Sequence, residues 1–321
     1  MLVCKECFRD EELCSEIQNT AKKDGACEIT GIRGKVVDLA EYGEFFRAIY
    51  ALYKPLAKGT PLASVIQSDW GLFKDVNVAE KIIIEIFGTN PPVVYNNYIT
   101  SQLMQWEGLK TEVREKSRFF TDPDFLDNFD FKTVTLKKGS RLYRARITPK
   151  GVKQLPKKKM GCPESGKATS GRANPLGIPY LYLCEDKETT YYEVRSVYLD
   201  KLSIGRFRVE DDLNIVDFHY DLSLFSAYTD GDDSLEVIAA PKIVINAISK
   251  DLSKPLRRYD TELEYVPTQY LCEYCKTSLN ADGICFESSL HKGHFNYVLF
   301  DQKDATCTSV ISHEITDVSM K

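Results

Sequence analysis

The sequence predicts an α+β protein, in which an all-helical N-terminal bundle is followed by a compact domain of mixed strands and helices. Apolar residues recur every three or four positions in residues 36–120, the period of amphipathic helices. After residue 132, short runs alternate apolar and polar residues as strands do. The acidic, proline-containing segment 121–131 lies between these regions and indicates a linker. We therefore expect two domains, residues 1–128 and 129–321.

Four helices are expected in the bundle, because four apolar-periodic runs are separated by turn signals. Thr60 and Pro61 suggest an N-cap and a first-turn proline for the second helix. Gly88 and the following prolines would end the third helix. The four expected helices cover residues 39–50, 60–73, 77–87 and 101–120. A shorter helix-like run, residues 11–20, precedes them.

The first 34 residues are rich in cysteine, and two interpretations of them stay open. Cys4 and Cys7 form a CxxC pair, but Thr30 stands where a second pair starting at Cys27 would need its second cysteine. One interpretation is a structural zinc site of Cys4, Cys7 and Cys27, with Cys14 as a candidate fourth ligand. The other, which the broken second pair favours, is a set of reduced cysteines packed in a small helix pair.

The C-terminal region is expected to form a sheet with helices beside it. Runs 133–136 and 141–147 alternate like paired strands around a turn at Lys138 and Gly139. The other expected strands are 202–209, 214–218, 284–286 and 297–300, and the expected helices are 235–248 and 262–277. Cys272 and Cys275 fall in the middle of the last helix without the turn of a zinc knuckle, so we interpret them as packing residues.

Residues 169–195 combine a glycine-containing loop, a short strand and a helix, and each offers polar side chains. The loop holds Arg172 and Asn174, and alternation in the strand 180–183 places Tyr182 on one face. Asp186 is a suitable N-cap for a helix that carries Glu193. We expect these side chains to meet near one point.

These motifs resemble the RES domain family, which is named for an arginine, a glutamate and a serine. GRANPLGIPYLYL (171–183), followed ten residues later by Glu193, is similar to the centre of that domain. RLYRAR (141–146) is similar to its opening strand, with the arginine at Arg144, and DGICFESS with NYVLF (282–300) to its closing hairpin, with the serine at Ser288. The resemblance covers residues 135–302 and implies a fold related to ADP-ribosyltransferases.

The resemblance implies that NAD is the substrate, and that Arg144, Arg172, Asn174, Tyr182, Glu193 and Ser288 line its pocket. Breaking the bond between nicotinamide and ribose develops positive charge on the ribose, which Glu193 would stabilise. The two arginines would bind phosphate or ribose oxygens. Tyr182 would contact the base, and Ser288 would donate to ligand oxygens or position the nucleophile.

Three positions compete with these assignments, because they lie close to them in the sequence or in the predicted fold. Arg146 shares the strand face of Arg144. Ser289 and Thr268 are alternatives to Ser288. Taken singly, an arginine and a glutamate more often form a surface ion pair, so the assignments depend on the order of the motifs.

Three functions remain open at this point. The first is an NAD glycohydrolase or phosphorylase acting as a toxin or defence effector, with NAD as substrate and no further cofactor. The second is an ADP-ribosyltransferase that modifies a macromolecule. The third is a catalytically idle NAD-binding interaction module. A protein antitoxin or activating partner, and an oligomer, would fit the family.

The N-terminal region resembles the HEPN-like domain that precedes some RES domains, through its cysteine start and the KSRFF segment (116–120). HEPN ribonucleases use an arginine and a histidine that are separated by four to six residues. The four histidines are His219, His291, His294 and His313, and none falls in the bundle. The expected role of the bundle is therefore sensing, docking or oligomerisation, not RNA cleavage.

The overall charge, hydrophobicity and cysteine pattern argue against several other classes of protein. A net charge of −5 and a pI near 5.6 argue against nucleic acid as a partner over the whole surface. No apolar run reaches the roughly 18 residues that a membrane span needs. The start, MLVCKE, lacks the basic and apolar regions of a secretory signal. The cysteines do not form a small disulfide framework, so a cytoplasmic location is expected.

Overall fold

The computed structural model describes residues 1–231, 234–254 and 262–316. The chain divides into two compact units. The first unit comprises Met1–Gln105 and Asp221–Val244, and the second unit comprises Trp106–Tyr220 and Ile245–Lys321. The units are discontinuous in sequence, and the expected domains 1–128 and 129–321 stay a prediction.

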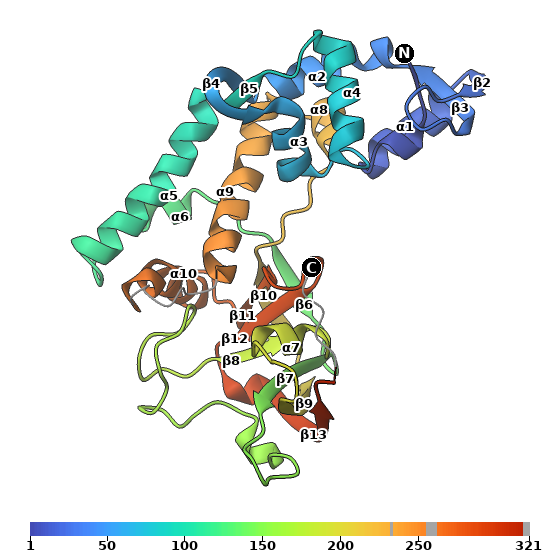
Figure 1. Ribbon diagram of the computed structural model, residues 1–321. Helices are drawn as coiled ribbons and strands as arrows, with labels where there is room; N and C mark the ends of the chain where they lie inside the picture. Colours follow the sequence, from blue (N-terminus) through green and yellow to red (C-terminus); the bar gives the residue numbers. More distant parts are fainter. Residues whose placement is uncertain (232–233, 255–261, 317–321) are drawn as a thin grey trace. The chain divides into compact units, whose positions relative to one another are not determined.

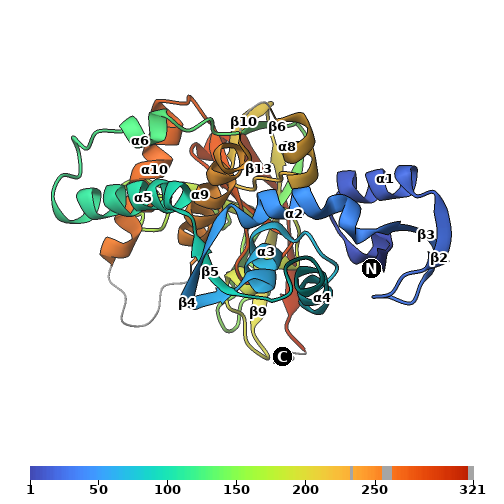
Figure 2. The ribbon, with the colours of Figure 1, turned by 90° about the horizontal axis from the view of Figure 1, so that it is seen from above.

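The first unit contains strands as well as helices, so the prediction of an all-helical bundle is wrong (Figures 1 and 2). One sheet has the order β1-β3-β2, and a second pairs β4 with β5. The strand β2 (KDGA) has no buried side chain, so its sequence shows no apolar alternation. Its pairing with β3 depends on the backbone, which explains why periodicity did not reveal it. The strands are β1 (Leu2–Val3), β2 (Lys23–Ala26), β3 (Arg33–Asp38), β4 (Tyr53–Pro61) and β5 (Pro92–Tyr95).

The helices of this region follow the predicted periods more closely than the strands do. The helix α1 (Glu11–Thr20) has the predicted bounds, and Asp10 caps it by accepting from the backbone N–H of Leu13 at 3.1 Å. The prediction for 60–73 began too early, because Thr60 and Pro61 end β4. The remaining helices are α2 (Gly43–Tyr50), α3 (Leu62–Trp70), α4 (Val76–Phe87) and α5 (Asn97–Glu115).

The core of the first unit includes residues from far along the chain. The helix α8 (Leu224–Asp230) and the start of α9 (Leu235–Ser253) bury side chains in the same core as α1 to α4. The ring centroids of Phe45 and Phe225 lie 5.3 Å apart in an edge-to-face arrangement. The fully or nearly buried contributors from this segment are Leu224, Ala227, Leu235, Ala239, Ala240 and Ile243.

The second unit is built on an eight-stranded sheet of order β13-β9-β7-β8-β12-β11-β10-β6. All neighbouring strands are antiparallel except β10 and β11. Every strand run expected after residue 132 is present, together with β13 at one edge, which was not predicted. The strands are β6 (Thr133–Leu136), β7 (Arg141–Ile147), β8 (Leu181–Cys184), β9 (Lys201–Val209), β10 (Leu213–Asp217), β11 (Gly283–Glu287), β12 (Phe295–Leu299) and β13 (Ala305–Glu314).

The expected hairpin of β6 and β7 does not form, although both strands do. The strand β6 pairs with β10, whereas β7 pairs with β9 and β8. The turn between them forms hydrogen bonds to residues outside the two strands. Lys138 N–H donates to Asp212 Oδ1 at 2.8 Å, and Gly139 N–H donates to the Val209 carbonyl at 2.8 Å. The turn is therefore held by the end of β9 and by the β9–β10 connection, and the two strands pair with different partners.

Helices α6 (Asp124–Asp127), α7 (Thr189–Glu193) and α10 (Val266–Thr277) complete the second unit, with the later parts of α5 and α9. A side-chain hydrogen bond links these parts of α5 and α9: Trp106 Nε1–H donates to Asp251 Oδ2 at 2.8 Å. Cys272 and Cys275 on α10 are completely buried, as expected of packing residues.

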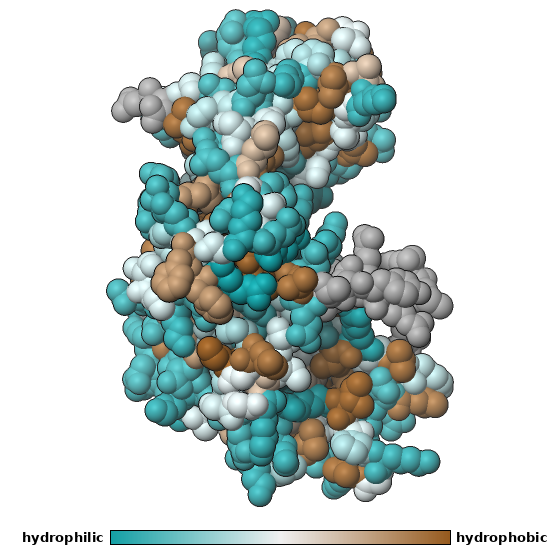
Figure 3. Space-filling model, turned by 90° about the vertical axis from the view of Figure 1, so that its left-hand side faces the viewer, coloured by the Kyte–Doolittle hydropathy of each residue, from teal (hydrophilic) through white to brown (hydrophobic). Residues whose placement is uncertain are grey.

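Over the part of the chain that the structure describes, no helix is long and apolar enough to cross a membrane. On the face drawn in Figure 3, hydrophobic side chains lie in small groups separated by hydrophilic ones.

Candidate active site

A cavity of about 440 Å³ lies in the second unit. Its wall is formed by the loop 169–174, by β7, β8 and β12 of the sheet, by α7, and by the end of α9, and Figure 1 shows α7 lying against the sheet beside β7 and β8. Small-molecule sites typically have volumes of about 300–1,000 Å³. The cavity therefore has the size of a ligand site.

Arg144 on β7 brings a positive charge to this cavity. Its Nη1 donates to the carbonyls of Met160 and Gly161, at 3.3 and 3.1 Å. Arg146, two residues further along the same strand face, donates from Nη2 to the Gly161 carbonyl at 2.8 Å. Burial, together with the neighbouring charge of Arg146, lowers the pKa of Arg144 to about 10. Neither arginine forms an ion pair with a carboxylate of the described residues, so the pair leaves positive charge for an anion.

Arg172 brings a second guanidinium from the loop 169–174. Its Nη1 donates to the Leu252 carbonyl at 2.9 Å, and burial lowers its pKa, opposed in part by Tyr265 and Glu193. The backbone carbonyl of Arg172 accepts a hydrogen bond of 2.7 Å from the Thr268 hydroxyl at the start of α10. The helix α10 thus fixes the backbone from which Arg172 extends.

Asn174 and Tyr182 hold the rest of this loop against β8. The Tyr182 hydroxyl donates to Asn174 Oδ1 at 2.8 Å and accepts from the Ala173 N–H at 3.1 Å. Asn174 Nδ2 donates to three backbone carbonyls, those of Thr169, Pro175 and Ile178. Because its polar atoms are used inside the loop, Asn174 shapes the wall of the cavity.

Glu193, the last residue of α7, faces the cavity with a carboxylate that is held from one side. Its Oε1 accepts hydrogen bonds from the Ser288 hydroxyl and from Asn296 Nδ2, each 2.7 Å long. Both bonds end on Oε1 and leave Oε2 without a hydrogen bond from the described residues. The same cavity therefore presents a fixed negative charge together with Arg144 and Arg172.

The residues expected at the site lie around this cavity, with Ser288 behind its wall. Ser288 is buried, and its hydroxyl reaches Glu193 and not the cavity. The alternatives Arg146, Ser289 and Thr268 also lie outside the lining. Roles in binding and catalysis stay predictions for the residues that line it: Arg144, Arg172, Asn174, Tyr182 and Glu193.

A family model described as the RES domain matches residues 141–319, more than half of the chain. This chain belongs to the RES domain family. The sequence of the chain is also 11% identical to a chain of the M. tuberculosis MbcT–MbcA toxin–antitoxin complex, known from a crystal structure. That similarity has a TM-score of 0.31 and covers 69% of this chain and 93% of the other. No curated protein matches the chain.

A HEPN-like N-terminal domain is not supported. The family match begins at residue 141, and the strands β1 to β5 lie in the first unit, where the resemblance implied a bundle of helices. The similarity of the cysteine start and of the KSRFF segment (116–120) involves few residues, and α5 ends at Glu115, before that segment.

Several residues in or behind the wall of the cavity were not singled out from the sequence. Asn296 on β12 was assigned only to the closing hairpin, yet it holds Glu193, and its buried Oδ1 has no hydrogen-bond partner. Tyr265 and Arg195 line the cavity, and Arg195 has a φ of 50° in the left-handed region, which is uncommon for residues other than glycine. A polar residue in the middle of an apolar strand, as Asn296 is, was the available signal.

A group of titratable side chains lies next to Ser288, the residue that holds Glu193. Ligand atoms of Asp186, His291 and His294 lie within 4.8 Å of one another, and the two imidazole rings are stacked 3.8 Å apart. His294 Nδ1 lies 2.9 Å from Asp186 Oδ2. Burial alone would raise the pKa of Asp186, but hydrogen bonds from Thr189 and the neighbouring His294 hold it below its ordinary value.

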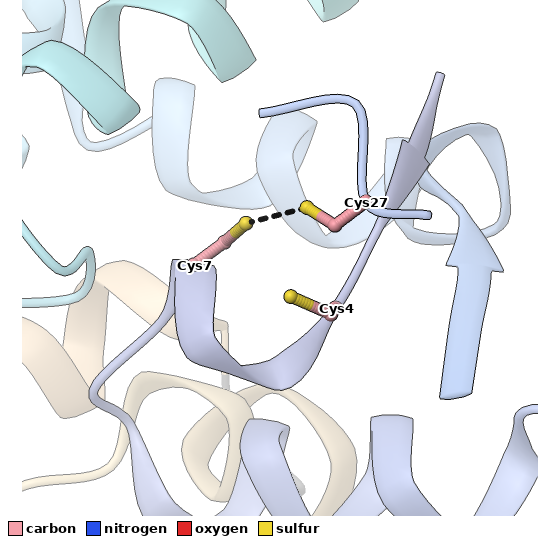
Figure 4. A group of neighbouring side chains, drawn as sticks. All are labelled: Cys4, Cys7 and Cys27. Carbon is pink, nitrogen blue, oxygen red and sulfur yellow. Dashed lines mark hydrogen bonds between the residues drawn. The ribbon is translucent and has the colours of Figure 1, made fainter. Parts of the chain in front are cut away.

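The three cysteines of the predicted zinc site lie together in the first unit (Figure 4). The sulfur atoms of Cys4, Cys7 and Cys27 lie within 4.8 Å of one another, and all three side chains are buried. Cys14 is not part of this group, because its thiol donates to the Lys5 carbonyl at 3.4 Å. The three cysteines do not lie in a pair of helices, so that part of the second interpretation is wrong: Cys4 precedes and Cys7 ends a 3₁₀ turn, and Cys27 follows β2.

Proposed function

We propose that this RES domain protein binds NAD and cleaves the bond between nicotinamide and ribose. The observation that carries the proposal is the combination of charges in one cavity of the second unit. Glu193 is held there by Ser288 and Asn296, while Arg144 and Arg172 line the same cavity without a carboxylate partner among the described residues.

The carboxylate matches the charge that the reaction develops. As the nicotinamide leaves, its ring takes the bonding electron pair and the ribose becomes an oxocarbenium-like cation. A carboxylate fixed in advance stabilises this charge without reorganising during the reaction. Two donors on Oε1 keep Glu193 in place and leave Oε2 to face the ribose.

The arginines match the pyrophosphate of NAD. A buried guanidinium beside another cation is destabilised, as the lowered pKa of Arg144 indicates, and a phosphate would relieve that cost. We propose that Arg144 and Arg172 bind the phosphates, that Tyr182 forms the wall beside the nicotinamide, and that Asn174 and Ser288 position these groups.

The decisive experiment measures nicotinamide release from NAD by the purified full-length protein. Glu193→Gln keeps the size of the side chain and removes its charge. Losing one such electrostatic contact costs about 2.7–4 kcal/mol, or roughly a hundred- to a thousandfold in kcat, while NAD still binds. Glu188→Gln is the matched control, because Glu188 is exposed, lies just before α7 and does not line the cavity. Wild-type kcat in Glu193→Gln would contradict the proposed mechanism.

The acceptor of the ADP-ribosyl group is decided by the products. Free ADP-ribose identifies a glycohydrolase, and ADP-ribose 1″-phosphate formed in phosphate buffer identifies a phosphorylase. Nicotinamide release that needs a macromolecule, which then gains mass, identifies an ADP-ribosyltransferase. NAD binding without nicotinamide release identifies a catalytically idle interaction module.

An enzyme that consumes NAD harms the cell that makes it unless its activity is controlled. We therefore include in the proposal that the protein acts in the cytoplasm as a toxin or defence effector, and that a protein antitoxin or an activating partner controls it. Depletion of cellular NAD on expression of the wild-type chain, and not of Glu193→Gln, tests this part.

A further inference from the structure

Two tight loops bring the three cysteines of the first unit together, and each loop is closed by a backbone hydrogen bond to the carbonyl of its first cysteine. In the first loop, the Cys7 N–H donates to the Cys4 carbonyl at 3.1 Å. In the second, the Gly31 N–H donates to the Cys27 carbonyl at 2.9 Å, and the Thr30 N–H donates to the Cys27 sulfur at 3.4 Å. The second loop thus closes around its cysteine as a metal-binding knuckle does, with Thr30 at the position of the second cysteine.

The left-handed conformation of Gly31, with φ of 71°, lets the second loop turn back toward Ile32. The sulfur atoms point toward one another from the two loops (Figure 4), and those of Cys7 and Cys27 are 3.5 Å apart. Zinc–sulfur bonds of about 2.3 Å at tetrahedral angles separate sulfurs by about 3.8 Å. Small side-chain adjustments therefore suffice for all three sulfurs to bind one ion.

We propose that the first unit binds one zinc ion through the thiolates of Cys4, Cys7 and Cys27, with a fourth position beside Thr30 that an exchangeable ligand such as water fills. Binding converts three thiols to thiolates and releases three protons. The Thr30 hydroxyl lies 3.4 Å from the Cys4 sulfur and the residue is partly exposed, so solvent reaches this side of the site.

The packing around the cysteines indicates what the ion would do. The strand β2 has no buried side chain, and β3 buries only Val36 and Val37. A hairpin with so little apolar contact gains stability from a cross-link, as small domains do from structural metals. The ion would tie the 3₁₀ turn between Cys4 and Cys7 to the hairpin of β2 and β3.

The test is metal analysis of the full-length protein purified without added chelator, followed by replacement of zinc with Co²⁺. The wild-type protein should hold one equivalent of zinc, and its Co²⁺ form should show thiolate-to-metal charge-transfer absorption. Thr30→Cys supplies a fourth thiolate, so this absorption should rise by about a third and the metal should be bound more tightly. Cys14→Ser is the matched control and should keep both the stoichiometry and the spectrum, because Cys14 points elsewhere.

Three results would overturn the proposal. The first is wild-type protein without zinc that also takes up no Co²⁺, whether or not Thr30→Cys does. The second is loss of metal in Cys14→Ser. The third is equal charge-transfer absorption in the wild type and Thr30→Cys, which would mean that another cysteine already completes the site. Because these readouts are independent of NAD, the proposal stands or falls separately from the proposed enzymatic function.

Discussion

At the scale of single residues, the position of Glu193 is determined by two donors from another part of the chain. Ser288 and Asn296 are 95 and 103 residues away in sequence, and both bond to the same carboxylate oxygen. Ser288 also accepts from the N–H of His291 at 3.1 Å, which fixes the orientation of its own hydroxyl. In the proposed reaction, the serine of the RES motif would therefore act through the glutamate.

We predict that Ser288→Ala lowers kcat for nicotinamide release about tenfold, with a smaller change in KM. A hydrogen bond to a charged group contributes about 1.5–3 kcal/mol, and Asn296 remains to hold Glu193, so the loss should fall at the low end. Steady-state kinetics measure it. Ser289→Ala is the control, because the Ser289 hydroxyl donates to the Ser253 carbonyl and does not reach Glu193. A change in KM alone in Ser288→Ala would point to direct contact with NAD.

Asp304 allows a prediction about stability and pH. Burial, with the nearby carboxylates Asp301 and Asp282, raises its pKa from an ordinary value of 3.8 to about 6. The folded protein then holds this proton more tightly than the unfolded chain, so stability falls as pH rises from about 4 to about 6. Asp304→Asn should therefore stabilise the protein at pH 8 by about 1 kcal/mol, discounted for solvent screening, and not at pH 3.5.

Denaturant unfolding at the two pH values checks this prediction. The exposed Asp130→Asn serves as the control and should change stability little at either pH. Equal stabilisation by Asp304→Asn at pH 3.5 and pH 8 would show that the ionised carboxylate is not the cause.

At the scale of elements, the loop 169–174, which carries Arg172, is hydrogen-bonded both to α10 and to β8. Gln269 Nε2 on α10 donates to the Gly171 carbonyl at 2.7 Å, and Asn174 bonds to Tyr182 on β8. Gly171 allows this packing, because a Cβ atom there would lie 2.5 Å from Asn174 Oδ1 and 2.8 Å from the Tyr182 hydroxyl. The shape of the cavity therefore depends on the absence of a side chain at Gly171.

We predict that Gly171→Ala raises KM for NAD and destabilises the protein by about 1–3 kcal/mol, as overpacking does. The added methyl group separates Asn174 from Tyr182 and moves the neighbouring Arg172. Gly108→Ala on α5 is the control: its Cβ would meet no atom within 4 Å, and alanine favours the helix. Thermal melting and NAD titration measure the two effects. An unchanged KM would show that the loop does not determine binding.

At the scale of the whole molecule, the RES match and the compact units do not coincide. Residues 221–244 fall inside the matched segment 141–319, yet several of their apolar side chains, among them Leu224, Ala239 and Ile243, are buried in the core of the first unit. The family resemblance therefore does not by itself delimit a segment that buries all of its apolar residues.

We predict that a fragment of residues 129–321 is soluble only at low yield and binds the dye ANS. Leu224, Ala239 and Ile243 would lose the core that buries them in the full chain, and an exposed apolar patch of this kind promotes association. Size-exclusion chromatography and ANS fluorescence, compared with the full-length protein, provide the measurement. A monodisperse fragment that does not bind ANS would show that 221–244 repacks.

The sequence alone determined the local elements whose apolar residues follow a clear period, such as α1, β7 and β9. The order of the RES motifs predicted Arg144, Arg172, Tyr182 and Glu193 as site residues, and these residues line one cavity. Only the tertiary structure decided the rest. It placed β6 beside β10 and not beside β7, it brought Asn296 and Ser288 to Glu193, and it paired the polar strand β2 with β3. The first two features depend on hydrogen bonds between residues far apart in sequence, and the third on backbone bonds of a strand without buried side chains, so none of them leaves an apolar period in the chain.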